Sequence, residues 1–158
     1  MTAPHRRAFT LVEILIVVVI LGILAAIVIP QFTNASTDAQ RGNVLTQLKS
    51  IRNQIELYRA QHNSNAPVLA GTGAIAFLQL VNPPAPAAPY LRSAPTNPRN
   101  GSTSVGVDSS PTNTATSIAA ATMDPMAAGA PGWIYNQATG GFACVGFDEG
   151  TMKWFGEP

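Results

Sequence analysis

The chain begins with a short polar segment that changes into a long apolar one. From Phe9 to Ile29 the only polar side chains are those of Thr10 and Glu13. Wound as an α-helix with a rise of about 1.5 Å per residue, this run is long enough to cross the hydrocarbon core of a bilayer. The pattern therefore predicts a membrane-spanning helix near the N-terminus.

After Pro30 the apolar positions become periodic. They recur at spacings of three and four residues, at Val44, Leu48, Ile51, Ile55 and Tyr58. This spacing places them on one face of a helix, and most charged side chains lie off that face. The run Asn-Ser-Asn-Ala-Pro at 63–67 ends the helix. We therefore expect one long helix from Phe9 to about Gln61, with only its first half in the membrane.

The middle of the chain alternates short apolar segments with turn-forming residues. Ile75–Val81 predicts one or two helical turns, whereas Asn82–Pro89 holds too many prolines for a helix or a central strand. Residues 102–130 are rich in Ser, Thr and Ala and carry almost no charge. We expect this stretch to form an extended, exposed insertion without regular structure.

Near the C-terminus the pattern indicates a small sheet. Gly132–Asn136 and Gly141–Val145 are separated by a Thr-Gly-Gly turn, which is typical of a β-hairpin. Thr151–Phe155 predicts one more strand. The expected fold class is α+β, in which the second half of the long helix packs on a small antiparallel sheet.

Composition and charge narrow the function. Charged residues make up only 11% of the chain, against about 25% in ordinary soluble domains. The formal net charge of +1 gives no electrostatic reason to expect a nucleic-acid partner. His5 and His62 lie far apart in sequence, and no nucleophile triad or phosphate-binding loop accompanies them, so we expect no enzyme. The single cysteine, Cys144, cannot form an intramolecular disulfide and is interpreted as a small buried apolar residue.

Glu13 is the exceptional residue of the apolar run. A carboxylate in a lipid-facing helix costs on the order of 2–3 kcal/mol or more, which makes it a functional candidate by default. The simpler alternative is that its side chain reaches the membrane surface. Arg6 and Arg7 precede the run and no basic residue follows until Arg41, so the N-terminus is expected in the cytoplasm and the remainder outside.

Gly22 and Pro30 are the helix-weakening residues of the same run. Proline removes a backbone donor and its ring clashes with the preceding helical turn. We therefore predict a helix kink at these positions.

Three interpretations of the N-terminus compete. An ordinary secretory signal would be cut near Thr33-Asn34-Ala35, but the apolar run is longer than a usual signal core and contains a carboxylate. That interpretation would make the chain a secreted binding domain. A plain single-span anchor would give Glu13 no role. The third interpretation is a segment whose carboxylate has a function.

The run Arg-Arg-Ala-Phe-Thr-Leu-Val-Glu at 6–13 resembles the N-terminal signal of the type IV pilin and pseudopilin family. The resemblance implies that a prepilin peptidase cuts between Ala8 and Phe9 and methylates the Phe9 amine. The family usually has glycine before the cut, where this chain has Ala8. The implied organisation is a leader at 1–8, a transmembrane and assembly helix at 9–30, and a soluble pilin-like domain at 31–158.

The same resemblance implies a filament built from copies of the chain. Each subunit would lie in lipid before assembly, with its N-terminus in the cytoplasm and its soluble domain in the bacterial periplasm, and would join the filament at an inner-membrane assembly platform. Within one chain Glu13 lies one helical turn after Phe9. In the filament, its carboxylate would pair with the α-amino group of Phe9 in a neighbouring copy. That pairing would offset the burial of both charges.

A second segment, Pro89–Gly101, resembles a loop of the major pseudopilin of type II secretion. It favours a pseudopilin that supports protein export; the alternative is a type IV pilus subunit for adhesion, motility or DNA uptake. Pseudopilins of this type often hold a calcium ion in a late loop, to which Asp124, Asp148 and Glu149 could contribute. The surrounding residues depart from that pattern, and no other cofactor is expected.

Overall fold

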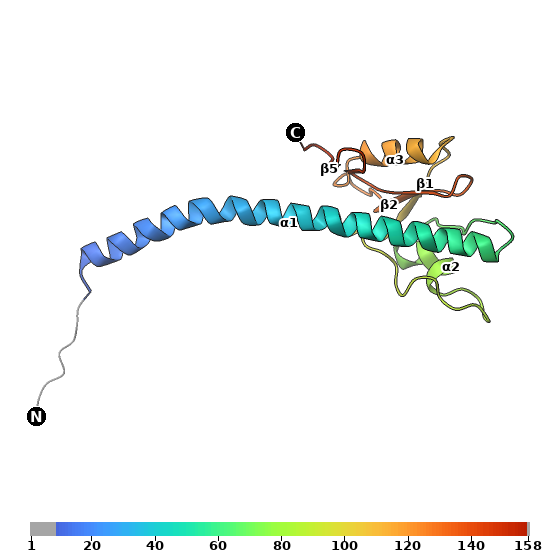
Figure 1. Ribbon diagram of the computed structural model, residues 1–158, viewed down its shortest axis with the longest axis horizontal. Helices are drawn as coiled ribbons and strands as arrows, with labels where there is room; N and C mark the ends of the chain where they lie inside the picture. Colours follow the sequence, from blue (N-terminus) through green and yellow to red (C-terminus); the bar gives the residue numbers. More distant parts are fainter. Residues whose placement is uncertain (1–8, 158) are drawn as a thin grey trace, which may run out of the picture. The chain divides into compact units, whose positions relative to one another are not determined.

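The computed structural model describes residues 9–157, and its longest element is one helix at the start of the chain. This helix, α1 (Leu11–Gln61), covers 51 residues and is drawn as an unbroken ribbon in Figure 1. The chain divides into two compact units, one ending at Ala39 and one beginning at Gln40, so α1 contributes to both. The predicted long helix is confirmed, with Phe9 and Thr10 preceding its first turn.

Gly22 and Pro30 lie inside α1 without interrupting it. Pro30 has no backbone N–H to donate to the carbonyl of Ala26, one turn earlier. The helical conformation nevertheless continues, and Thr33 Oγ1 donates to the carbonyl of Ile29 at 3.2 Å. The chain therefore stays helical at both positions, and the kink stays a prediction.

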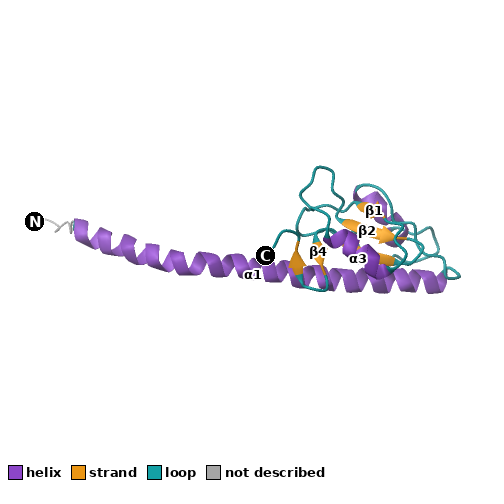
Figure 2. Ribbon diagram, turned by 90° about the horizontal axis from the view of Figure 1, so that it is seen from above, coloured by secondary structure: helices purple, strands orange, loops and turns teal. Residues whose placement is uncertain are grey.

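The unit from Gln40 onward, called the head, contains all the other elements. They are η1 (Gly73–Phe77), α2 (Leu78–Val81), β1 (Val105–Val107), α3 (Asn113–Ala121), β2 (Trp133–Asn136), β3 (Gly141–Cys144), β4 (Phe147–Asp148) and β5 (Lys153–Trp154). One sheet has the order β1-β2-β3 and a second consists of β4 and β5. Figure 2 shows these short strands gathered beside the second half of α1. The α+β class is confirmed.

The three-stranded sheet is mixed. β2 and β3 form the predicted antiparallel hairpin, with Trp133 opposite Cys144 and Asn136 opposite Gly141. β1 pairs parallel to β2, which departs from the expected all-antiparallel sheet. The reason is that β1 comes from the stretch that was expected to be irregular and returns to β2 through a helix, a connection that produces parallel neighbours.

One face of this sheet packs against α1 with large side chains. The predicted helix stripe and the alternate residues of the two hairpin strands form a single buried cluster that includes Val44, Leu48, Ile51, Ile55, Trp133, Tyr135, Phe142 and Cys144. Each is exposed by 2% or less, and Tyr58 is partly buried at the end of the stripe. The expectation that this helix face covers the sheet is confirmed.

The other face of the sheet is covered by α3, so the expectation for residues 102–130 was wrong. Ala120 of α3 packs with Ile134, Ala143 and Val145, the residues that alternate with those facing α1. Figure 1 shows α3 and α1 on opposite sides of the strands. Small side chains allow this approach: a Cβ on Gly141 would lie 2.8 Å from Oδ1 of Asn113.

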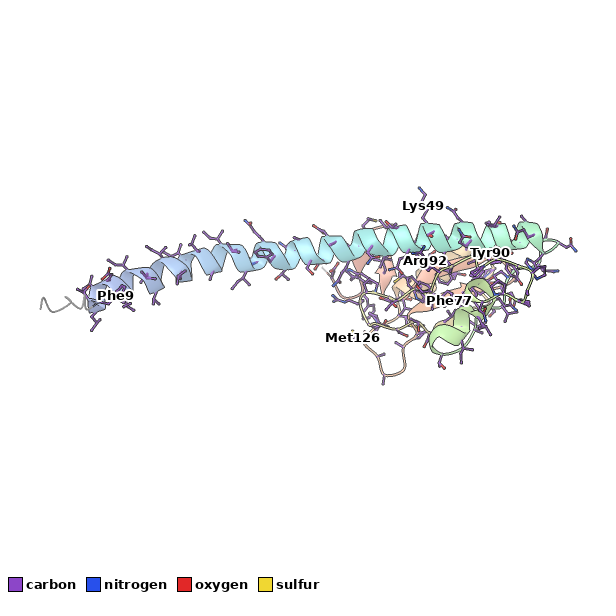
Figure 3. All side chains as sticks on the ribbon, turned by 90° about the horizontal axis from the view of Figure 1, so that it is seen from below. Phe9, Lys49, Phe77, Tyr90, Arg92 and Met126 are labelled. Atoms are coloured by element: carbon purple, nitrogen blue, oxygen red, sulfur yellow. The ribbon has the colours of Figure 1, made fainter. Side chains whose placement is uncertain are left out.

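A buried asparagine fastens the segment that leads into the sheet. Asn97 is fully buried, and its Nδ2 donates to the carbonyls of Gly132 at 2.9 Å and Val145 at 3.1 Å. Trp133 Nε1 donates to the carbonyl of Pro95 at 3.1 Å. The two side chains therefore hold residues 95–97 against the hairpin. Figure 3 shows by contrast that Met126, which is 69% exposed, lies on a loop that projects from the head.

Ala120→Leu tests the position of α3. We expect this change to lower the free energy of unfolding of the head by about 1–3 kcal/mol, because the added methylenes have no space between α3 and the sheet. Ala128→Leu, on the exposed loop of the same alanine-rich stretch, is the control and is expected to change stability by less than about 0.5 kcal/mol. Urea unfolding of the full chain in detergent, followed by tryptophan fluorescence, measures both. Equal effects of the two changes would contradict the packed helix.

Candidate functional site

Two groups of residues are candidates. One is the start of α1, and the other is the set of carboxylates Asp124, Asp148 and Glu149, of which the last two lie in residues 147–154, called the late loop. Phe9 is 76% exposed and Glu13 lies in the first turn of α1. The backbone N–H of Glu13 donates to Thr10 Oγ1 at 3.2 Å and to the Thr10 carbonyl at 3.1 Å. Thr10 therefore caps the helix, and the Glu13 carboxylate lies near the positive end of the helix dipole.

The sequence also contains a capping signal at the start of this helix. Thr10-Leu-Val-Glu13 matches the capping-box pattern, in which Ser or Thr is followed three residues later by Glu. The structure shows the threonine half of this pattern, in which the Thr10 hydroxyl accepts from the Glu13 backbone N–H; the Glu13 carboxylate contributes through its place near the positive end of the helix dipole. Ala8, Arg6 and Arg7 lie outside the described residues, so the cleavage position itself carries no structural information.

The first half of α1 offers a continuous apolar surface. Among the described residues, α1 is the one helix long and apolar enough to cross a membrane, and none of its most apolar 18-residue window is buried. Its large side chains remain 41–84% exposed from Leu11 to Ile29. Such a surface is stable only when lipid or other protein covers it.

The late loop begins at β4, and its first carboxylate, that of Asp148, accepts hydrogen bonds from within the loop. Asp148 Oδ1 accepts from the backbone N–H of Gly150 at 2.8 Å, and Oδ2 accepts from Thr151 Oγ1 at 2.7 Å. These hydrogen bonds, that of Thr151 first, hold the pKa of Asp148 below its ordinary value. The carboxylate therefore closes a turn.

Glu149 points instead to the side chain of Arg52 on α1. Arg52 Nη1 donates to Glu149 Oε2 at 2.7 Å and Nη2 donates to Oε1 at 2.6 Å, which is a two-pronged ion pair. Arg52 Nε and Nη2 also donate to the carbonyl of Phe142 on β3, at 2.9 and 2.6 Å. These groups line a cavity of about 500 Å³ that Ser117 of α3 also borders.

The three carboxylates proposed for calcium do not converge. Asp124 belongs to the loop after α3, where its Oδ1 accepts from the backbone N–H of Met126 at 2.8 Å. In residues 9–157, no three Asp, Glu, His or Cys side chains lie together in a way that could hold a metal ion. Asp124 lies on another loop, and Asp148 and Glu149 are directed to different partners, so these three carboxylates do not form a common set of calcium ligands.

Cys144 and His62, also noted in the sequence, contribute to the packing of the head. Cys144 is buried in the core and burial raises the pKa of its thiol, so its sulfur is poorly reactive. His62 stacks on Tyr58 with ring centroids 3.9 Å apart, and its Nδ1 lies 2.8 Å from the Tyr58 carbonyl. Both therefore belong to the packing of the head.

Comparison with known families finds one match at the N-terminus. Residues 4–29 match the family model described as the prokaryotic N-terminal methylation motif. This segment contains Ala8, Phe9 and Glu13, and the resemblance drawn from residues 6–13 is confirmed. No solved structure matches the chain.

Similar proteins cover more of the chain. It is 31% identical over 97 residues to a type II secretion system core protein G of Pectobacterium carotovorum, covering 60% of this chain and 62% of that protein. It is 30% identical over 104 residues to the core protein G of Klebsiella michiganensis, covering 64% of this chain and 73% of that protein. The chain thus spans about three fifths to three quarters of these relatives.

A shorter match with a higher identity links the chain to type IV pilins. The type IV major pilin protein PilA of Myxococcus xanthus is 46% identical over 48 residues, covering 30% of this chain and 22% of that protein. The similarity to the core protein G relatives extends over about twice as many residues as the similarity to this pilin.

Thr10→Val tests the cap at the start of α1. Losing the hydroxyl acceptor is expected to weaken the first helical turn by about 0.5–2 kcal/mol and to speed hydrogen exchange of the Glu13 amide by roughly 2–30-fold. Thr10→Ser keeps the acceptor and should exchange at close to the wild-type rate. NMR hydrogen exchange of the chain in detergent micelles measures the difference, and equal rates for all three proteins would contradict the cap.

Proposed function

Because the chain belongs to the type II secretion system core protein G family, we propose that it is a structural subunit of a pilus-like filament that supports protein export. The observation that carries the proposal is the apolar first half of α1, which leaves its large side chains exposed and holds one carboxylate in its first turn. Catalysis and a bound cofactor form no part of this proposal.

The exposed apolar surface of α1 is covered first by lipid and later by neighbouring copies of the chain. Before assembly, lipid covers it, because the run is long enough to span a bilayer. In the filament, the same surface packs against α1 of neighbouring copies; because lipid tails are as apolar as these side chains, close van der Waals packing favours this association, not removal from water. One segment therefore serves first as an anchor and then as the core of the filament.

Glu13 and the amine of Phe9 direct that packing. Cleavage after Ala8 creates a new α-amino group one helical turn before the carboxylate, and the two charges in adjacent copies can pair. A buried charge pair is weak evidence for stability, but it sets the register in which two helices meet. Thr10 supports this arrangement by holding the first turn of the helix in place.

The orientation in the membrane follows from the basic residues. Arg6 and Arg7 precede the apolar run and the next basic residue is Arg41. The N-terminus therefore faces the cytoplasm, where the prepilin peptidase and the inner-membrane assembly platform act on the subunit. The head lies in the periplasm.

A type IV pilus subunit for adhesion, motility or DNA uptake is the second candidate. The observation in its favour is the 46% identity over 48 residues to the pilin of Myxococcus xanthus. The longer similarity to core protein G favours the secretion role. A neighbouring gene for a retraction ATPase would favour the pilus instead.

The first prediction of this proposal concerns processing. Protein extracted from membranes is expected to begin at Phe9 and to carry the extra mass of one methyl group on its amine. Mass spectrometry of the intact protein and of its N-terminal peptide measures both features. An intact Met1 start or a cut near Ala35 would contradict it, and the latter would indicate a secreted domain.

The second prediction concerns Glu13→Ala. The variant should stay in the membrane, because removing a carboxylate from an apolar helix favours its insertion. In filaments it leaves the neighbouring amine without a counter-charge, a loss of roughly 3–5 kcal/mol per subunit. We expect the ratio of sheared filament protein to membrane-held protein to fall at least about tenfold.

Two further variants sharpen this test. Glu13→Gln should be milder, because an amide oxygen still accepts a hydrogen bond from the amine. Val12→Ala shortens an apolar side chain in the same turn without changing charge, and it should assemble nearly as wild type. Normal filament yield from Glu13→Ala at equal expression would contradict the paired-charge account and leave the carboxylate only its place near the positive end of the helix dipole.

A further inference from the structure

The side chain of Arg52 joins three parts of the head. It extends from α1, donates twice to the Phe142 carbonyl on β3, and holds both oxygens of Glu149 in the loop after β4. Ser117 Oγ of α3 lies 3.5 Å from Glu149 Oε1. One guanidinium therefore connects the long helix, the sheet and the late loop, and its carboxylate partner also borders α3.

The geometry is that of a strong pair. Both guanidinium nitrogens involved are within 2.7 Å of separate carboxylate oxygens, which is the parallel two-pronged arrangement that arginine forms and lysine cannot. The side chains of Arg52 and Glu149 are 37% and 24% exposed, so water screens the pair only in part. The Nε–H and the second N–H of Nη2 donate to the Phe142 carbonyl of β3.

The same loop could be closed in another way, by a divalent cation bound to its carboxylates. That alternative requires carboxylates directed at one common point, and the two in this loop are directed at different partners. Asp148 accepts from Gly150 and Thr151, and Glu149 accepts from Arg52. A cation entering beside Glu149 would also meet the positive charge of Arg52 at ion-pair distance, which opposes its binding.

We propose that Arg52 of α1 closes the late loop in place of a bound divalent cation, so that the head folds and remains stable without calcium. The cationic charge comes from the long helix itself instead of from solution. The stability of residues 147–154 is then set by the chain alone and does not follow the calcium concentration of the surroundings. This proposal concerns the head and holds whichever machine the subunit serves.

The experiment uses the full chain in detergent micelles. Trp154 on β5 and Trp133 on β2 are both buried, so tryptophan fluorescence reports unfolding of the loop and the sheet. Thermal unfolding is recorded with the chelator EGTA and with millimolar calcium chloride at matched ionic strength. We expect the same Tm in both. A higher Tm with calcium, in the way that a ligand of the native state raises it, would overturn the proposal.

Variants then test the arginine directly. Arg52→Gln removes the charge and the two-pronged pair, and is expected to lower the Tm by about 4–8 °C. Arg52→Lys should fall between it and wild type, because lysine keeps the charge without the fork. The control is Arg59→Gln, which breaks an exposed pair with Glu56 on the same helix at 3.2 Å. A fall in Tm after Arg52→Gln no larger than after Arg59→Gln would contradict the role of Arg52.

Direct binding keeps the test decisive if Arg52→Gln fails to fold. Terbium luminescence, excited through tryptophan, and calorimetric titration with calcium are applied to the wild-type chain. The expected result is no stoichiometric binding. Binding of one ion that is lost in Asp148→Asn would show that the loop is closed by a metal and would overturn the proposal.

Discussion

The apolar first half of α1 constrains everything else about this chain. A surface whose large side chains are 41–84% exposed cannot persist in water, so the subunit must always have a neighbour, whether lipid or another copy. A single helix can be stable both in lipid and against another copy, because it satisfies its own backbone hydrogen bonds. Glu13 is the one charged side chain in this surface, and its carboxylate lies at the positive end of the helix, one turn from the amine that the proposed cleavage would create.

The head is organised by a different requirement, which is to cover a short sheet on both faces. α1 supplies a stripe of branched aliphatic side chains on one face, and α3 supplies alanine on the other. Arg52, Asn97 and Trp133 then bind the intervening segments through hydrogen bonds to backbone carbonyls. The sheet therefore gains its stability from being enclosed, because its strands are only three or four residues long.

Sequence reasoning succeeded where periodicity was strong and failed where side chains were small. The stripe from Val44 to Ile55 and the hairpin were predictable, because spacing alone determines which side chains face inward. Residues 113–121 are Asn, Thr, Ser, Ala and one Ile, which give almost no contrast between faces, so α3 was missed. A signal was present elsewhere: Trp133–Tyr135 and Phe142–Val145 are apolar at every position, as expected for strands covered on both sides. The Arg52–Glu149 pair could not be predicted, because 97 residues separate its members.

The difference in side-chain size between the two faces of the sheet also bears on how the sequence can diverge. Three hairpin positions facing α1 are filled by the large residues Trp133, Tyr135 and Phe142, with Cys144 beside them. Related chains can exchange one large apolar side chain for another at those three positions but cannot easily shrink them. The positions facing α3 hold smaller residues, Ile134, Ala143 and Val145, and Gly141 beneath the first turn of α3 has no room for a Cβ. We therefore expect related chains to vary among bulky residues on the side facing α1, and on the other side to keep residues 141 and 143 small for as long as α3 covers them.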